Sequence, residues 1–196
     1  MDASIPVDAS TGVPTPGAPG GGGSATVARR VYVAGGAGAG KTTLGRALAD
    51  KLGCRHYCWD RGELPAQEQE TVAGGAWVVE GAHLWAIEPY LQAADVIVWL
   101  DVSLARTVPR IVLRHARLSA AGANPHPGLR KLARFVARQP IYAWGPARAP
   151  RRPTDWGALT RAQTQRTLAP YGDRLVRLRR PSQVRSWLQQ LDFIDA

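Results

Sequence analysis

The sequence predicts an α/β domain built on a doubly wound, mostly five-stranded parallel sheet. Apolar runs alternate with amphipathic stretches along the chain, and the connections between them are short. The runs VYVA, WVVE and VIVWL are also continuous in their apolar character, which is typical of strands covered by helices on both faces. Ligands bind to such sheets beyond the carboxyl ends of the strands, so we expect the functional residues there.

Each predicted element is placed by its hydrophobic period and by the Gly, Pro or charged residues that bound it. In chain order, we expect strands over 30–34, 55–59, 76–80, 95–100 and 174–178. We expect helices over 41–52, 63–73, 84–93, 104–119, 158–169 and 181–191. Pro109 falls within one of these helices and predicts a kink or a later start. The Arg- and Pro-rich region 120–156 has no predicted element.

The 196 residues suit one domain with an N-terminal leader. Residues 1–28 are rich in Pro, Gly, Ala, Ser and Thr, so we expect a disordered leader, followed by the folded domain over 29–196. No apolar stretch approaches the ~20 residues of a membrane span. The N-terminus also lacks the basic and apolar regions of a secretory signal. We therefore expect a cytoplasmic protein without a membrane partner.

The segment GGAGAGKTT, residues 35–43, lies between the first strand and the first helix and fits G-x-x-x-x-G-K-[ST]. Its glycines allow backbone amides to curl around a phosphate, and the positive end of the next helix faces the same phosphate. We expect Lys41 to contact the β- and γ-phosphates of ATP and the Thr42 hydroxyl to bind Mg²⁺. A glycine-rich turn that binds nothing is disfavoured by the Lys-Thr pair and by these flanks. The predicted nucleotide-binding residues are Gly35, Gly36, Ala37, Gly38, Ala39, Gly40, Lys41, Thr42 and Thr43.

Three carboxylates, Asp60, Glu80 and Asp101, are each the first acidic residue after an apolar run. We expect them at the edge of the sheet that holds the phosphate loop, as a magnesium and base cluster. Asp60 is the candidate base or acceptor ligand. Asp101 is a candidate magnesium residue, with a role at the start of the next helix as the alternative. For Glu80, which precedes Gly81, a surface salt bridge is the alternative.

Four arginines, Arg106, Arg110, Arg114 and Arg117, share one face of the helix predicted over 104–119. Like charges so placed repel one another unless an anion compensates them. We expect Arg110 and Arg114 to stabilise the charge on a transferring phosphoryl group. Arg106 and Arg117 are interpreted as an exposed basic stripe.

Charge is distributed unevenly along the chain. Residues 1–100 carry 7 Lys/Arg and 10 Asp/Glu, whereas residues 101–196 carry 18 Lys/Arg and 5 Asp/Glu. Such a basic half is compatible with nucleic acid, with a lid over a polyphosphate or with a solvated basic surface. Cys54, His56 and Cys58 alternate within one short strand, and no second Cys/His cluster completes a zinc site, so we expect reduced thiols.

Taken together, these segments resemble the adenylate-kinase-related P-loop proteins called DNA topology modulation proteins. The resemblance runs from about Arg30 to Leu191 and rests on VYVAGGAGAGKTTLGRALADKLG, YCWD, WVVEGAH and ADVIVWLDVSLARTVPRIVLRHARL. It implies a nucleotide-kinase-like fold and ATP binding. The family usually has Asp-Gly in place of Glu80-Gly81 and a proline in place of Ser103. It also has a longer segment than the 16 residues, 61–76, that follow Asp60 here, so we expect a reduced or altered acceptor pocket.

The leading hypothesis is an ATP-dependent kinase that acts on a nucleoside- or nucleotide-like small molecule. Its predicted catalytic residues are Lys41, Asp60, Arg110 and Arg114, with Mg²⁺ held by Thr42 and Asp101. The alternative is an ATP-binding regulatory or nucleic-acid-associated protein without kinase activity. A GTPase switch ranks third, because the Asn-Lys-x-Asp motif of that class is missing. No oligomeric state is predicted.

Overall fold

Five parallel strands form one sheet in the order β2-β3-β1-β4-β5, which confirms the predicted fold class. The computed structural model describes residues 29–62, 72–152 and 155–191. The strands are β1 (Arg30–Gly35), β2 (Arg55–Cys58), β3 (Trp77–Gly81), β4 (Val96–Leu100) and β5 (Leu175–Leu178). The chain adds β2 and β3 on one side of β1 and then β4 and β5 on the other. The loop after β1 therefore leaves the sheet at the point where the strand order reverses.

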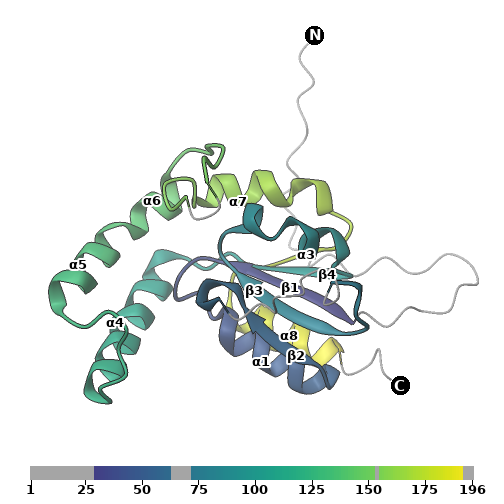
Figure 1. Ribbon diagram of the computed structural model, residues 1–196, viewed down its shortest axis with the longest axis horizontal. Helices are drawn as coiled ribbons and strands as arrows, with labels where there is room; N and C mark the ends of the chain where they lie inside the picture. The colour runs from purple at the N-terminus through teal and green to yellow at the C-terminus, as the bar shows by residue number, and fades with distance from the viewer. Residues whose placement is uncertain (1–28, 63–71, 153–154, 192–196) are drawn as a thin grey trace, which may run out of the picture.

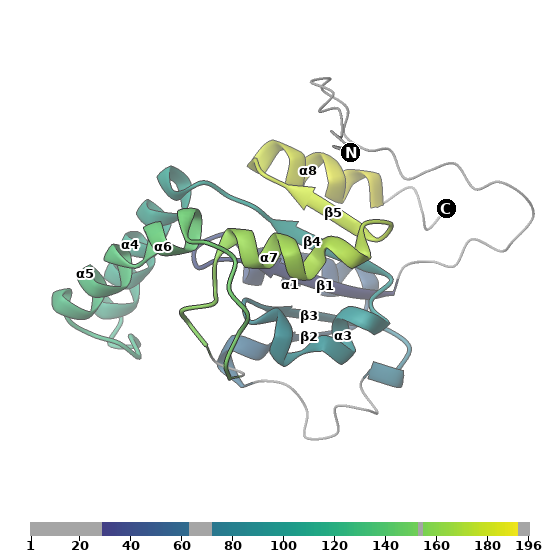
Figure 2. The ribbon, with the colours of Figure 1, turned by 90° about the horizontal axis from the view of Figure 1, so that it is seen from above.

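Helices cover both faces of the sheet, as the continuous apolar strands predict (Figures 1 and 2). On one face, α1 (Lys41–Leu52) and α8 (Pro181–Gln190) pack on a core that includes Val31 and Val33. On the other, α3 (Glu88–Ala93) and α7 (Arg161–Leu168) cover a core that includes Tyr32 and Trp99. Successive residues of β1 thus belong to opposite cores, because strand side chains alternate between faces.

A helical arm extends from the sheet and is formed by α4 (Leu104–Ala120), α5 (Leu129–Ala137) and α6 (Gln139–Trp144) (Figures 1 and 2). Helix α4 continues through Pro109, which lies on its exposed side near the start. Helices α5 and α6 correct the sequence prediction, which placed no element over 120–156. The apolar residues of α5, Leu129, Leu132, Phe135 and Val136, have the spacing of an amphipathic helix, so the sequence itself carries a signal for this element.

Two other differences concern the elements beside the site. The stretch predicted as one helix over 84–93 is a 3-10 turn, Leu84–Ala86, followed by α3, whose second residue is a proline. The predicted leader and most of the predicted helix over 63–73 lie outside the described residues. Within the described ranges, no helix combines the length and the apolar character that crossing a membrane requires.

The strand register places the carboxyl ends together at one edge of the sheet. Glu80 of β3 pairs with Val33 of β1 and with Cys58 of β2, and Gly35 of β1 pairs with Leu100 of β4. The residues that follow β2, β3 and β4 consequently begin beside the glycine-rich loop.

Candidate nucleotide and acceptor site

The glycine-rich loop turns from β1 into α1 through left-handed backbone conformations. Gly38 has φ 72° and Gly40, which precedes the first residue of α1, has φ 104°, a region that favours glycine. A Cβ atom on Gly38 would lie 2.7 Å from the carbonyl oxygen of Thr107 in α4, so the arm packs tightly on the loop. The first turn of α1 leaves amide groups unpaired within the helix, and these can bind an anion.

Lys41 and Asp60, two of the predicted catalytic residues, meet at the end of the loop. Lys41 Nζ lies 3.3 Å from Asp60 Oδ2 and 3.4 Å from the carbonyl oxygen of Gly36. The lysine is 9% exposed. Asp60 reaches it from the 3-10 turn Trp59–Arg61 that follows β2. Lys41, the side chain that is expected to hold a phosphate, is therefore next to the carboxylate that follows β2.

Asp60 is held as a carboxylate by its surroundings. Burial by itself raises the pKa of this group, but His83, the charge of Lys41 and the amide of Ala82 outweigh it and lower the pKa to about 2. The Ala82 amide donates to Asp60 Oδ1 at 3.0 Å, and His83 Nδ1 lies 3.9 Å from the same oxygen. Asp60 is consequently ionised at neutral pH and available to accept a hydrogen bond.

Glu80 lies at the end of β3 and is fully buried rather than paired on the surface. Neither carboxylate oxygen has a hydrogen-bond partner among the described residues, and Oε1 is 3.3 Å from His56 Nε2. The Cys58 thiol lies on the paired strand, where burial and then the charges of Glu80 and Asp60 raise its pKa to about 12. A buried carboxylate without a donor fits a hard divalent cation such as Mg²⁺, as does the Thr42 hydroxyl in the first turn of α1.

The predicted cluster of Asp60, Glu80 and Asp101 does not form. In the parts of the chain that the structure describes, no group of three or more His, Cys, Asp or Glu side chains is arranged to hold a metal ion. The strand order explains the difference. Asp101 follows β4, which lies beyond β1 from Glu80 and so about two strand spacings of ~4.8 Å away.

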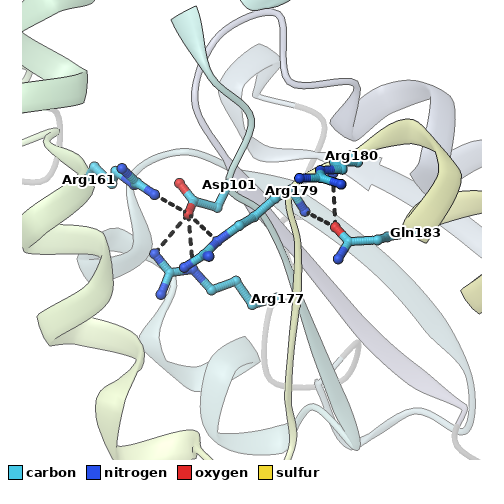
Figure 3. Close-up of polar contacts among 6 residues, drawn as sticks. All are labelled: Asp101, Arg161, Arg177, Arg179, Arg180 and Gln183. Atoms are coloured by element: carbon cyan, nitrogen blue, oxygen red, sulfur yellow. Dashed lines mark hydrogen bonds and ion pairs between the residues drawn. The ribbon is translucent and has the colours of Figure 1, made fainter. Parts of the chain in front are cut away.

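Asp101 is instead the centre of an arginine cluster (Figure 3). Its Oδ2 accepts hydrogen bonds from Arg161 at 2.6 Å and from two nitrogens of Arg177 at 3.0 and 2.8 Å. Arg179 Nε lies 3.4 Å from the same oxygen. Burial raises the pKa of Asp101, but Arg161 and Arg177 outweigh it, so the pKa is lowered. Through these contacts Asp101 joins α7 to β5 rather than capping α4. Ser103, at the start of α4, makes no side-chain cap either.

Of the four arginines of α4, Arg110 has a described contact with the glycine-rich loop. Arg110 Nη1 donates to the carbonyl oxygen of Ala39 at 3.4 Å. Arg114 lines an open hollow of about 310 Å³ together with Arg110, Leu113, Arg117 and Leu118. The structure therefore brings Arg110 to the glycine-rich loop, while Arg114 lies one turn further along α4. Arg117, expected on an exposed stripe, shares the hollow with Arg114.

A larger cavity of about 500 Å³ opens at the carboxyl ends of β4 and β5. Its lining includes Arg106, Tyr142, Trp144, Arg179 and Arg180. The Tyr142 ring also packs on the glycine-rich loop, because a Cβ atom on Gly36 would lie 2.8 Å from it. Sequence reasoning missed Tyr142 and Trp144, which lie in the region without predicted elements. Arg179 and Arg180 line the same cavity, and the Arg-Arg-Pro run at the start of the last helix is a sequence signal that could have indicated them.

Comparisons with known proteins give a likeness of fold only. No family model matches the chain, and no curated protein matches it. Among solved structures, the chain is similar to shikimate kinase from Acinetobacter baumannii in complex with shikimate. The two share 20% sequence identity over 59% of this chain and 78% of that chain, with a TM-score of 0.35. It is also similar to deoxyadenosine kinase from M. mycoides with bound dATP, at 12% identity over 83% of this chain and 98% of that chain and a TM-score of 0.44.

Both of these similar structures are kinases, but likeness at this level carries no argument about activity. The resemblance to DNA topology modulation proteins stays a prediction from the sequence. The function is therefore argued from the site.

Proposed function

We propose that this protein is an ATP-dependent phosphotransferase that moves the γ-phosphoryl group of ATP to a hydroxyl of a nucleoside-like or nucleotide-like small molecule. The observation that carries the proposal is the 3.3 Å contact between Lys41 Nζ and Asp60 Oδ2. It joins the cation of the glycine-rich loop to an ionised carboxylate at the end of another strand. A phosphoryl donor at Lys41 and an acceptor hydroxyl at Asp60 would then lie side by side, which is the arrangement that transfer requires.

The donor would be held by residues of the loop and the arm. In this proposal the amides of residues 35–43 and the Lys41 ammonium group bind the phosphates. The nucleotide base enters the 500 Å³ cavity, where Arg106 and Trp144 offer flat faces on which a base stacks. Tyr142 closes the gap between this cavity and the loop, because its ring packs on Gly36.

Magnesium would be held by Thr42 and Glu80. Both supply hard oxygen ligands, and the Glu80 oxygens have no hydrogen-bond donor within the described residues. When bound, Mg²⁺ supplies charge compensation for the phosphates. We leave Asp101 out of this site, because an oxygen surrounded by three guanidinium groups offers a divalent cation a repulsive environment.

The chain's own side chains would then serve the transfer itself. Asp60 accepts a hydrogen bond from the acceptor hydroxyl and orients its oxygen toward the γ-phosphorus. Arg110, next to the loop at Ala39, and Arg114, one turn further, compensate the charge of the transferring group when the arm closes. This assignment keeps the predicted catalytic set of Lys41, Asp60, Arg110 and Arg114.

An ADP-release assay tests the proposal directly. The protein is supplied with Mg·ATP and a panel of nucleosides, nucleotides, sugars and small alcohols, and ADP is measured against a background without acceptor. We expect at least one acceptor to raise ADP release by the wild-type protein. No acceptor should raise ADP release by Lys41→Ala. Tight binding of Mg·ATP without acceptor-dependent ADP release would contradict the kinase function.

A second candidate function is an ATP-binding, nucleic-acid-associated protein without kinase activity. The observation that favours it is the stretch 102–154, which contains eleven Lys/Arg and no Asp/Glu. Duplex binding at low salt that weakens steeply as salt rises would support this candidate. An absence of any duplex or single-strand binding at low salt would remove it.

A further inference from the structure

Three tryptophans from separate segments converge on His83, beside Asp60. The ring of Trp59 lies 5.4 Å from the His83 ring, that of Trp85 lies 5.5 Å away, and that of Trp156 lies 4.6 Å away, measured between centroids. Trp59 follows β2, Trp85 follows β3, and Trp156 precedes α7. We call Trp59, His83, Trp85 and Trp156 the aromatic wall.

The ring nitrogens of His83 have a long ion-pair contact with Asp60 but no hydrogen bond among the described residues. The residue is 1% exposed, and neither ring nitrogen has a hydrogen-bond partner among the described residues. Its Nδ1 is 3.9 Å from Asp60 Oδ1, which is too long for a hydrogen bond. Because buried polar groups in folded proteins are nearly always paired, these nitrogens point to a ligand that supplies the partner.

Trp156 is the member of the wall that can meet a ligand. It is 57% exposed, while its ring edge contacts His83 at 86° between the ring planes. The chain before it is attached to the wall, since Trp85 Nε1 donates to the carbonyl oxygen of Arg152 at 3.2 Å. An exposed indole beside an unpaired imidazole offers a stacking face and a polar contact at one place.

The charge around Asp60 argues against a phosphorylated ligand here. Residues 53–62 and 72–100, the described part of this side, contain four Asp/Glu and two Lys/Arg, Arg55 and Arg61. Arg55 begins β2 and so lies at the strand end opposite to Asp60, and Lys41 is already paired with Asp60. Arg148, which lies against Gly157 next to Trp156, is paired with Asp155 at 3.0 Å. A phosphorylated acceptor would bring a dianion toward the Asp60 carboxylate, and recognition of such a group normally relies on several guanidinium groups.

We infer that the acceptor is an unphosphorylated hydroxyl compound with a flat aromatic ring, such as a nucleoside. Its ring stacks on Trp156, and its polar atoms pair with His83 while its hydroxyl meets Asp60. This inference rests on the phosphotransferase function proposed above and narrows its acceptor to one class.

The transfer then balances as follows. The acceptor oxygen forms a bond to the γ-phosphorus of ATP as the bond from that phosphorus to the β,γ-bridging oxygen breaks. ADP leaves with the electron pair of that bond, and the acceptor proton passes to the Asp60 carboxylate and on to water.

The first test compares acceptors that differ only by a phosphate. ADP release is measured with nucleosides against their 5′-monophosphates, at fixed Mg·ATP. We expect kcat/KM to favour the unphosphorylated member of a pair by about 100-fold, the scale of a specificity contact. Preference for the phosphorylated member, or equal use of both, would overturn the inference and leave the phosphotransferase function in place. No ADP release with any acceptor would overturn both.

The second test uses variants of the wall and of Arg61. Trp156→Ala should raise the acceptor KM about tenfold with the KM for ATP unchanged, since it removes one stacking face. Trp156→Phe, which keeps a ring, should restore most of the loss. Arg61→Ala should leave the acceptor KM unchanged, whereas a large rise would indicate a phosphate contact and contradict the inference.

A binding measurement without turnover completes the design. Acceptor binding to wild type, followed by tryptophan fluorescence in the absence of ATP, should change the emission, and His83→Gln should weaken that binding. Unchanged acceptor affinity in both His83→Gln and Trp156→Ala would show that the aromatic wall is not the acceptor site.

Discussion

The two sides of the glycine-rich loop differ sharply in charge and in side-chain type. Residues 102–154, which include the helical arm, contain eleven Lys/Arg and no Asp/Glu. Residues 53–62 and 72–100, the described residues around β2 and β3, contain two Lys/Arg and four Asp/Glu and contribute two of the three indoles of the aromatic wall. Lys41 lies at the boundary, paired with Asp60. We interpret the basic side as the place of a polyanionic donor and the acidic, aromatic side as the place of an uncharged acceptor.

In this proposal, one sheet edge holds two ligands of opposite character, a polyanion and an uncharged molecule. The doubly wound order puts β4 and β5 on one side of β1 and β2 and β3 on the other. The segment before α7 crosses to the ends of β2 and β3, where the Arg152 carbonyl and Trp156 lie. Charge can still differ between the two sides of β1, because most of each side comes from its own part of the chain. The following predictions test that division.

The largest effect is expected at Asp60, on the acceptor side. Asp60→Asn should lower kcat by about 10²–10⁴-fold, because the acceptor hydroxyl loses its anionic hydrogen-bond acceptor. The affinity for Mg·ATP, measured by calorimetry, should stay within a few-fold of wild type. A loss of ATP affinity equal to the loss of kcat would place Asp60 on the donor side and contradict the division into a donor side and an acceptor side.

The next effect concerns Arg114 on the arm. Arg114→Ala should lower kcat by about 10²-fold and weaken ATP binding less, because its contact forms mainly in the transition state. Arg130→Ala on α5 removes the same charge from an exposed position and serves as the control. Equal losses in kcat and ATP affinity would identify Arg114 as a ground-state phosphate ligand.

Asp101→Asn should act on stability rather than on chemistry. It leaves Arg161, Arg177 and Arg179 close together without their shared carboxylate. The arginines are partly exposed, so the cost should be about 1–3 kcal/mol of unfolding free energy, less than for a fully buried pair. Chemical denaturation of the variant measures it, and an unchanged midpoint would show that the cluster adds no stability.

The smallest effect is the response of stability to acid. The pKa of Asp60 is lowered to about 2, and that of Asp101 is lowered as well. At a pH near or below the ordinary Asp pKa of about 4, the folded state therefore binds fewer protons than the unfolded state. Stability from these groups is therefore complete above the ordinary Asp pKa of about 4 and is lost as pH falls toward 2. Denaturation midpoints between pH 6 and pH 3 should fall for wild type and fall less for Asp60→Asn. Parallel curves would contradict the assignment.

Sequence patterns predicted the centre of the sheet because β1, β3 and β4 are buried on both faces, so each of these three strands is a largely continuous apolar run. They also placed Asp60 after β2, where it meets Lys41. Asp101 was assigned to magnesium because a strand end does not reveal which distant arginines fold against it. Arg161, Arg177 and Arg179 lie at least 60 residues after Asp101 in the sequence.

The aromatic wall was missed for the same reason. Trp59, Trp85 and Trp156 are far apart in sequence and meet only because the chain before α7 returns to the ends of β2 and β3. No local period marks such a meeting. Helices α5 and α6 were missed for a different reason, because the Arg and Pro content of region 120–156 outweighed the helical spacing of Leu129, Leu132, Phe135 and Val136 in α5.

Isothermal titration calorimetry with Mg·ATP tests the central claim most directly. The account predicts saturable binding of one ATP per folded chain, which Lys41→Ala abolishes while its unfolding temperature without ligand stays close to wild type. Absence of both binding heat and thermal stabilisation by Mg·ATP in folded wild-type protein would contradict the account.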